Sequence, residues 1–563
     1  MAADGFTTRP VYMGTHGVLA AGHYLAAHAG QLMFDRGGNA IDAVVAAGFA
    51  LNLLKPHLNG PGGEVPLLVY SAKEEKVFSI SGQGFAGKAE TVEWFHDAGI
   101  DIVPGDGFLP ATVPAMFGSW AFALLRFGTL TLKDVLQPAI DLAESGFPVY
   151  PGLRRAIVGL AERFRTEWPS SAAVYLPGDR VPAVGDVLKN PDFAATLKKA
   201  VEVEAREKKR GREDAIQAVI DWWYKGEVAS TIVDFMKTPI RDASGKKHAG
   251  LLTLEDFAAW KPNLEPPVTV DYHGLSVYKC GPWTQGPVFL QQLRLLDGFD
   301  LVKLGHNTAT YIHTVIEAAK LAFADREKYY GDPDFVDVPL KLLLSKDYAA
   351  ERRELIDPKK ASLEMRPGAG PKSTPEDVKG KPETFRGDTT HTCAVDAAGN
   401  MVAATCSGGW IPSSPVVPGL GFPMGTRRRP RTTLTPSLML RDGKPYMVFG
   451  TPGGDQQDQW TLQFFLNYVD FGMNLQEAID APNFNSTHFP SSFYPRDAHA
   501  GELVVEGRIP EATRKELEAR GHKVKAAGDW SGGMVMAVQT ERKTGVISGA
   551  ASPRGQLAYV MGS

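Results

Sequence analysis

Apolar and polar residues alternate along the chain in patterns that predict both buried helices and β-strands. A run of apolar residues over 40–54 has helical spacing and predicts a long buried helix. The glycines of residues 59–63 require a sharp turn, and the apolar run over 65–70 that follows is typical of a strand. We therefore expect helices and strands to be interleaved from the start of the chain.

Further along, residues 111–149 show helical spacing, with Gly128 and Gly146 as the expected breaks. The segment 198–213 is crowded with charged residues of both signs. Such a run favours a helix face in contact with solvent over a binding patch.

The composition changes sharply between residues 356 and 386, where repeated prolines and glycines predict a linker. The pattern then reverses. Residues 389–395 read as a β-strand, 396–400 as a turn and 401–405 as the returning strand. A linker therefore runs directly into a β-hairpin whose first residue is a threonine.

Composition limits the classes of protein that these elements can build. The chain has 563 residues, of which 44% are hydrophobic and 22% charged, with a formal net charge of −4. These values exclude a wholly disordered chain, and they show no excess of basic charge that would indicate nucleic-acid binding. The length allows two to four compact units or one large two-part body. The chain has three cysteines, too few for a disulfide framework and without zinc-site spacing: Cys280, Cys393 and Cys406.

The start of the chain bears on where the protein works. Residues 1–14 lack the basic start and apolar core of a secretory signal. The most apolar window, 40–54, is too short to span a bilayer. We therefore expect a cytoplasmic protein that binds neither membrane nor nucleic acid.

A threonine at the start of a strand, directly after a linker, suggests a specific chemistry. A threonine hydroxyl needs a neighbouring base to act as a nucleophile. The α-amine of an N-terminal threonine can be that base, because its reference pKa is about 7.7–8.0. Such an enzyme first cuts its own chain, here between Asp388 and Thr389, by an N-to-O acyl shift. On spacing alone, the simpler interpretation is that Thr389 and Thr390 only begin a threonine-rich strand.

A second segment supports the chemical interpretation. The strand-like residues 447–449 lead into the glycine turn 450–455, and residues 462–469 then have helical spacing. A strand, a glycine turn and a helix start can aim backbone N–H groups at a developing negative charge. By itself, this pattern is usually only a turn.

Motifs spread over nearly the whole chain resemble the γ-glutamyltransferase family of N-terminal-nucleophile hydrolases. They comprise residues 37–43, 128–129, 137–139, 143–147, 324–326, 330–335, 389–391, 395–396 and 399–400. The most specific motif is Thr389-Thr390-His391, which is similar to the start of the family's small subunit. The resemblance therefore favours the catalytic interpretation of Thr389.

The resemblance also implies a fold and a set of roles. The implied fold is an α+β, four-layer αββα sandwich built from two self-cleaved fragments, a large subunit over 1–388 and a small subunit over 389–563. The large subunit would end in a flexible linker over about 356–388, and neither fragment is expected to fold alone. The implied roles are nucleophile for Thr389, support of its amine for Ser407, oxyanion binding for Gly453 and Gly454, and substrate contact for Thr432 and Thr433.

Other expectations about partners follow from the same resemblance. The substrate is a small-molecule amide, and the two fragments of the chain are partners of each other. We expect no cofactor and no metal, and a homo-oligomer is left open.

The sequence departs from the family where γ-glutamyl enzymes hold the glutamyl group. A family-like alignment over 88–95 places Val92 where those enzymes have an arginine for the α-carboxylate, and valine cannot make that bidentate pair. The family's acidic lid is shortened to residues 419–424, and Gly409 lies near the place of a family asparagine. We therefore expect a non-glutamyl acyl specificity, with hydrolysis favoured over transfer. The alternative is a genuine γ-glutamyl transferase or glutathione hydrolase with an altered pocket.

Several other residues allow two interpretations each. An apolar pocket wall and ordinary core packing are both open for Trp283, Trp410, Phe422 and Met424. The arginines of residues 427–429, with Arg431, could meet an acidic substrate group or form a solvated, ion-paired loop.

Two rival functions lie outside this enzyme class. One is a non-catalytic binding module that keeps the fold, which the joint presence of Thr389, Ser407, Gly453 and Gly454 disfavours. The other is a metal-dependent amidase, which lacks a ligand cluster in the sequence, since His16, His23 and His28 do not have zinc-ligand spacing. A chelator would distinguish the second rival.

Overall fold

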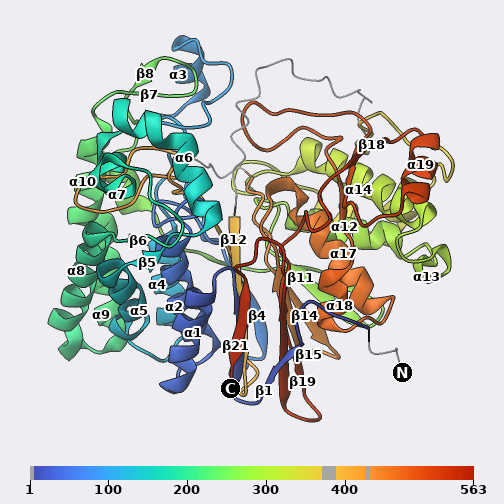
Figure 1. Cartoon of the computed structure of the whole chain (residues 1–563), viewed down its shortest axis with the longest axis horizontal. Coiled ribbons are helices and arrows are strands. Elements are labelled where there is room, and N and C mark those ends of the chain that lie inside the picture. Colours follow the sequence, from blue (N-terminus) through green and yellow to red (C-terminus); the bar gives the residue numbers. More distant parts are fainter. Residues whose placement is uncertain (1–4, 370–388, 426–430) are drawn as a thin grey trace.

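Two seven-stranded β-sheets lie face to face at the centre of the computed structural model, which describes residues 5–369, 389–425 and 431–563. Figure 1 shows one group of helices outside each sheet, so the layers follow the order helix, sheet, sheet, helix. This arrangement confirms the four-layer αββα architecture that the resemblance implies. Within the described ranges, no helix combines the length and the apolar character needed to cross a membrane.

Both sheets are antiparallel throughout. The first sheet has the order β21 (Tyr559–Gly562), β2 (Gly17–Ala21), β12 (Thr389–Asp396), β13 (Met401–Ser407), β3 (Leu67–Ser71), β4 (Lys76–Ile80) and β9 (Leu264–Glu265). The second sheet has the order β1 (Tyr12–Gly14), β20 (Val546–Ala551), β19 (Met536–Glu541), β15 (Lys444–Gly450), β14 (Ser437–Arg441), β11 (Leu275–Lys279) and β10 (Val268–Tyr272). Each sheet takes strands from both sides of residue 389, so neither predicted fragment holds a complete sheet.

Apolar cores fill the spaces between the layers. Between the sheets, Cys393 and Val395 of β12 pack with Leu438 and Val448 of the second sheet. The core outside the first sheet includes α1 (Tyr24–Asp35), α2 (Ala40–Leu54), α4 (Met116–Phe127), α5 (Leu132–Ser145), α6 (Pro151–Thr166), α7 (Pro169–Tyr175), α8 (Pro191–Glu207), α9 (Arg212–Lys225), α10 (Glu227–Met236) and α11 (Leu254–Ala259). The core outside the second sheet includes α12 (Gly286–Leu296), α13 (Leu301–Leu304), α14 (Ala309–Tyr329), α16 (Lys346–Arg353), α17 (Gln457–Val469), α18 (Leu475–Asp480) and α19 (Glu511–Ala519).

The remaining elements are short. The helices are α3 (Val92–Asp97) and α15 (Leu340–Leu343), and three 3₁₀ turns cover Pro177–Asp179, Lys208–Arg210 and Gly454–Gln456. The small sheets pair β5 (Phe147–Pro148) with β6 (Val187–Leu188), β7 (Ile240–Arg241) with β8 (Lys247–His248), and β16 (Phe484–Ser486) with β17 (Glu502–Val505) and β18 (Lys523–Ala526).

The buried helix predicted over 40–54 is confirmed as α2, and all of its residues are buried. Asp42, which interrupts the apolar run, closes a capping box with Asn39 at the start of this helix. The same carboxylate accepts a hydrogen bond from Thr129 Oγ1 at 2.7 Å. The buried Asp42 carboxylate therefore has hydrogen-bond partners on both segments, and it joins α2 to the turn before α5.

The helical region predicted over 111–149 divides into α4 and α5, which end at Gly128 and Gly146 as expected. The charged segment 198–213 is mostly exposed. Glu204 departs from that pattern, because its carboxylate accepts from the backbone N–H groups of Leu132 at 2.7 Å and Lys133 at 2.8 Å. This carboxylate caps the start of α5, where the helix dipole favours a negative charge.

The linker predicted over 356–388 begins with an ordered segment. Lys320 Nζ donates to Ser362 O at 2.8 Å, and Gly368 N donates to Asp325 Oδ1 at 2.8 Å. Residues up to 369 are therefore fastened to α14. Residues 370–388, including Asp388, lie outside the described residues.

Candidate active site

Thr389 is the first residue of β12, a central strand of the first sheet. In the register with β13, Thr389 lies opposite Ser407 and His391 lies opposite Thr405. Directly opposed residues of an antiparallel pair point to the same face. These four side chains therefore share the face on which Cys393 packs between the sheets. Thr389 and Ser407, predicted to act together, are both fully buried at this point.

His391 lies two residues along the strand from Thr389. Its Nδ1 atom is 3.0 Å from Thr405 Oγ1. Burial, reinforced by the charge of Lys279, lowers the pKa of His391 to about 3, so this imidazole stays neutral near pH 7. A Cβ added to Gly450 would lie 2.3 Å from the His391 ring, so the end of β15 passes directly against β12. The loop after β15 therefore starts beside the strand that carries Thr389.

That loop contains the glycines predicted to bind an oxyanion. Gly453 has φ 131° and Gly454 has φ 56°, a backbone region that favours glycine. An added Cβ would lie 2.2 Å from Trp460 at the first position and 2.6 Å from Phe493 at the second. Among the described residues, neither glycine N–H donates a hydrogen bond to the backbone or to a side chain. Gly453 is the N-cap and Gly454 the first residue of a 3₁₀ turn that leads into α17, as the sequence pattern predicts.

Gln285, which sequence reasoning missed, joins this loop to Thr432. Gln285 N donates to Thr432 O at 2.9 Å, and Gln285 Nε2 donates to Gly454 O at 3.3 Å. Arg326 Nη1 in turn donates to Gln285 Oε1 at 2.8 Å. The predicted oxyanion loop and the predicted substrate-contacting threonine are therefore held together by one buried residue, through its backbone N–H and its side-chain amide.

A buried carboxylate, Glu64, also contacts Thr432. Thr432 Oγ1 donates to Glu64 Oε1 at 2.9 Å, and Gln83 Nε2 donates to Glu64 Oε2. Glu64 and Gln83 are each 3% exposed, and Thr433 is buried beside Thr432. Neither Glu64 nor Gln83 was a sequence candidate. The glycine-rich turn directly before Glu64 was the signal that could have identified it.

Glycines bring Glu64 into this position through close backbone contacts. A Cβ added at Gly60 would lie 2.2 Å from Gly409 O, and one at Gly63 would lie 2.2 Å from Ser407 O. Glu64 then forms an isolated antiparallel bridge with Ser407. The backbone of the predicted turn over 59–63 thus lies in direct contact with the end of β13. Side chains at these glycine positions would prevent that contact.

The expected role of Val92 is not supported by its position. Val92 is 68% exposed at the start of α3. Figure 1 shows α3 at the far end of the helical layer, well away from the start of β12. The alignment over 88–95, which places Val92 at the position of the family's arginine, stays a prediction, and the exposed Val92 lies outside the buried row of Thr389 and Ser407. Gln83 donates to the same Glu64 carboxylate that accepts from Thr432.

The four apolar candidates are all buried. Phe422 stacks on Trp223 with ring centroids 5.6 Å apart, and Trp283 Nε1 donates to Glu265 Oε2 at 2.5 Å. Cys393 and Cys406 are buried free thiols, as expected for packing. Arg431 pairs with Glu327 at 2.8 Å, whereas residues 427–429 lie outside the described residues.

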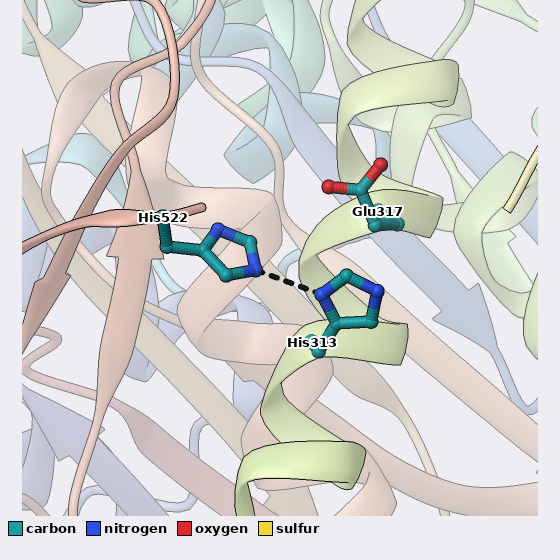
Figure 2. A group of neighbouring side chains, drawn as sticks. All are labelled: His313, Glu317 and His522. Atoms are coloured by element: carbon teal, nitrogen blue, oxygen red, sulfur yellow. Dashed lines mark hydrogen bonds between the residues drawn. The ribbon is translucent and has the colours of Figure 1, made fainter. Parts of the chain in front are cut away.

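One cluster among the described residues has the composition of a metal site: His313, Glu317 and His522. Figure 2 shows His313 and Glu317 one turn apart on α14, with the His522 ring reaching His313 from a separate segment. His313 Nδ1 and His522 Nε2 are 2.8 Å apart, and His313 Nε2 lies 2.7 Å from Asp357 O. Because a carbonyl only accepts, His313 Nε2 carries a proton, and its Nδ1 accepts from His522.

The surroundings of this cluster carry positive charge. Glu317 pairs with Lys320 through one carboxylate oxygen and with Arg366 through the other at 3.1 Å. Burial, and next the charge of Lys320, lowers the pKa of His522 to about 2. A dication would have to displace these protons and compete with two cations, so the residues fit a hydrogen-bonded clamp better than a metal site.

Comparisons with known proteins agree with this geometry. The family described as gamma-glutamyltranspeptidase matches residues 26–427 and 423–561. The Glutathione hydrolase-like YwrD proenzyme of Bacillus subtilis (strain 168) is 30% identical, covering 97% of this chain and 99% of that protein. The LmbA2991HD structure is 44% identical with a TM-score of 0.94, covering 99% of this chain and 100% of that chain. The cephalosporin acylase from Bacillus halodurans is 30% identical with a TM-score of 0.82, and the match covers 100% of this chain and 98% of that chain.

Proposed function

The chain belongs to the γ-glutamyltranspeptidase family of N-terminal-nucleophile amide hydrolases and transferases, and from this premise we propose that Thr389 is its nucleophile. The precursor cuts itself between Asp388 and Thr389. The processed protein hydrolyses an amide bond through an acyl-enzyme on Thr389, and the acyl group is not γ-glutamyl.

The position of Thr389 carries this proposal. It begins a central strand, lies opposite Ser407, and lies in the same cross-strand row as Glu64, whose carboxylate accepts from Thr432. A cut directly before it would leave its α-amine at the end of a rigid strand. Such placement on a regular element is what a preorganised nucleophile requires.

The chemistry follows from these groups. The neutral α-amine, with a reference pKa of about 7.7–8.0, takes the hydroxyl proton while Thr389 Oγ1 attacks the amide carbonyl carbon. The resulting oxyanion accepts from the N–H groups of Gly453 and Gly454. The ammonium then gives its proton to the leaving amine as the C–N bond breaks. Water attacks the remaining ester by the same route and releases the acid.

The names of similar proteins support both parts of the proposal. The YwrD protein is described as a proenzyme, which fits processing of one chain into two fragments. The acylase from Bacillus halodurans acts on cephalosporins by its description, which supports an acyl group other than glutamyl. The phrase "glutathione hydrolase-like" keeps glutathione hydrolysis as the second candidate. Because both sheets take strands from both fragments, we propose that the fragments stay together after cleavage.

Intact mass measurement tests the proposal. The purified protein is expected to show two fragments, the smaller one beginning at Thr389, and Thr389→Ala is expected to remain one chain without amidase activity. Ser486→Ala, which replaces another buried hydroxyl, serves as the control and is expected to be processed normally. Full-length wild-type protein that still hydrolyses amides would contradict the mechanism.

A further inference from the structure

A buried arginine near the end of α14 contacts the loop that holds the proposed oxyanion donors. The Arg326 side chain is fully buried, and its Nη1 atom donates both to Gln285 Oε1 at 2.8 Å and to Asp455 Oδ1. Asp455 directly follows Gly454 in the chain. The motif over 324–326 contributes to the family resemblance, and the proposed reaction leaves Arg326 without a role.

Arg326, Gln285 and Asp455 close a ring of hydrogen bonds beside the loop. Gln285 Nε2 donates to the backbone carbonyl of Gly454 at 3.3 Å and to that of Asp455 at 3.4 Å. The Asp455 carboxylate also accepts from Ser492 N at 2.8 Å and from Ser492 Oγ at 2.6 Å. The carbonyls and the carboxylate that directly follow the proposed donors are therefore all held by hydrogen bonds.

These bonds bear on the direction of the Gly454 N–H group. Gln456 N donates to Gly453 O at 3.1 Å. Because the peptide bond is planar and trans, the Gly454 N–H points away from that carbonyl within the same plane. The next peptide plane is held by Gln285 through the Gly454 carbonyl. Glycine has the freest backbone of all residues, so bonds from outside the loop are what fix these two planes.

Arg326 also compensates a negative charge beside the loop. The Asp455 carboxylate is 3% exposed, and an uncompensated anion there would oppose the charge of an oxyanion. Burial by itself raises the pKa of Asp455, but the charge of Arg326 and the hydrogen bonds to the carboxylate hold that pKa below its ordinary value. Glu327 also accepts from Arg326 at 2.9 Å, and it has further cations in Arg431 at 2.8 Å and Arg496 at 2.7 Å. The charge of Arg326 is therefore available to Asp455.

We propose that Arg326 is a positioning residue for amide hydrolysis, which holds the oxyanion loop in its working geometry through Gln285 and Asp455. It acts through the loop and not on the substrate. The proposal rests on the proposed function, because it takes this loop as the place where the oxyanion is bound. An interaction that matters only in the transition state changes kcat and leaves KM nearly unchanged.

Arg326→Lys tests the proposal on the processed protein, since lysine keeps the charge and loses the fork of donors. The substrate is whichever of the butyryl, glutaryl and γ-glutamyl p-nitroanilides the wild type hydrolyses fastest. We expect kcat per cut chain to fall about 10- to 100-fold, the scale of a displaced catalytic group. KM is expected to stay within about threefold of the wild-type value. A rise in KM with unchanged kcat overturns the proposal.

Arg366→Lys is the matched control, because Arg366 is also a buried arginine that pairs with a carboxylate, that of Glu317 at 3.1 Å. This variant is expected to lose stability and to keep the wild-type kcat per cut chain. A purely structural role for Arg326 predicts the same result in both lysine variants. Equal kcat values in the two variants would therefore overturn the proposal.

Amide hydrogen exchange needs no substrate, so it decides the proposal even if none of the anilides is hydrolysed. The peptide covering residues 450–460 is expected to exchange about tenfold faster in Arg326→Lys than in the wild type, because the loop opens more often. The peptide covering α2 is expected to keep its rate. Exchange of the loop at the wild-type rate overturns the proposal.

Asp455→Asn covers the case in which Arg326→Lys fails to fold, since asparagine keeps the shape of the side chain and removes its charge. Faster exchange of the same loop is expected, and an unchanged rate overturns the proposal. Failure of the proposed function gives a different result. In that case, the wild-type chain is not cut before Thr389, or activity survives in Thr389→Ala, whatever the effect of Arg326→Lys.

Discussion

Two buried glutamates show two different uses of a charged side chain in one fold. Glu317 on α14 pairs with Lys320 and with Arg366, and it accepts from the backbone of Ser362 at 3.3 Å. Glu64 accepts from a hydroxyl and an amide, and it lies in the backbone row of Thr389. The cations beside Glu317 are committed to the fold, whereas the groups on Glu64 line the proposed site.

The difference teaches that burial alone does not identify a functional acid. Both carboxylates are at most 3% exposed. What separates them is the chain around each one. Glu317 lies in a regular helix and fastens the segment near Ser362, whereas Glu64 follows glycines whose backbone packs against Gly409 and Ser407.

The largest expected effect concerns the stability role of Glu317. Glu317→Gln leaves Lys320 and Arg366 buried without their anion, which costs about 3–5 kcal/mol of folding free energy. Thermal denaturation of the processed protein measures the loss. Amide hydrolysis by the protein well below its melting temperature is expected to stay as in the wild type. A loss of hydrolysis with unchanged stability would remove the distinction between the two glutamates.

The next effect concerns the glycine loop that Gln285 joins to Thr432. Gly453→Ala introduces a Cβ 2.2 Å from Trp460 and displaces a proposed oxyanion donor. The expected loss in kcat is about 10²–10³-fold, the scale of one oxyanion donor. Gly443→Ala is the matched control, because Gly443 also has a positive φ of 69° and has nothing near its Cβ position. A similar loss in both variants would assign the effect to backbone strain alone.

Local patterns allowed most of the fold around the site to be predicted. The helix α2, the hairpin of β12 and β13, and the glycine turn before α17 each follow from spacing within about twenty residues. The family resemblance then supplied the layers. The contacts of Glu64 and Gln285 could not be predicted, because they join segments far apart in the chain and no local pattern encodes that distance.

The cluster around Glu317 is also expected to make stability depend on pH. Burial, and next the charge of Lys320, lowers the pKa values of His522 to about 2 and of His488 to about 3. Both rings are neutral in the folded state, while the unfolded chain takes up protons below about pH 6.5. Stability is therefore complete above pH 6.5 and is lost as the pH falls toward 3, by up to about 1.4 kcal/mol per pH unit for each ring.

Urea denaturation at pH 7 and pH 5 measures this dependence. His522→Gln keeps an amide donor where His522 Nε2 donates to His313 and removes one titrating ring. The variant is expected to lose less stability than the wild type between the two pH values. His16→Gln, at an exposed position, is the control and is expected to keep the wild-type slope. An unchanged slope in His522→Gln would mean that this ring is not the acid-sensitive one.

The smallest expected effect is that of metal removal. In Figure 2 the His313 and His522 rings face one another, and their 2.8 Å contact places a proton where a cation would have to lie. Both oxygens of Glu317 are already engaged by cations, so a dication would gain little attraction there. Dialysis against a chelator is therefore expected to leave both the melting temperature and anilide hydrolysis unchanged, and added zinc is expected not to raise the melting temperature. A melting temperature that falls on chelation and returns with one equivalent of zinc would make Glu317 a ligand, and the contrast with Glu64 would become one between two binding sites.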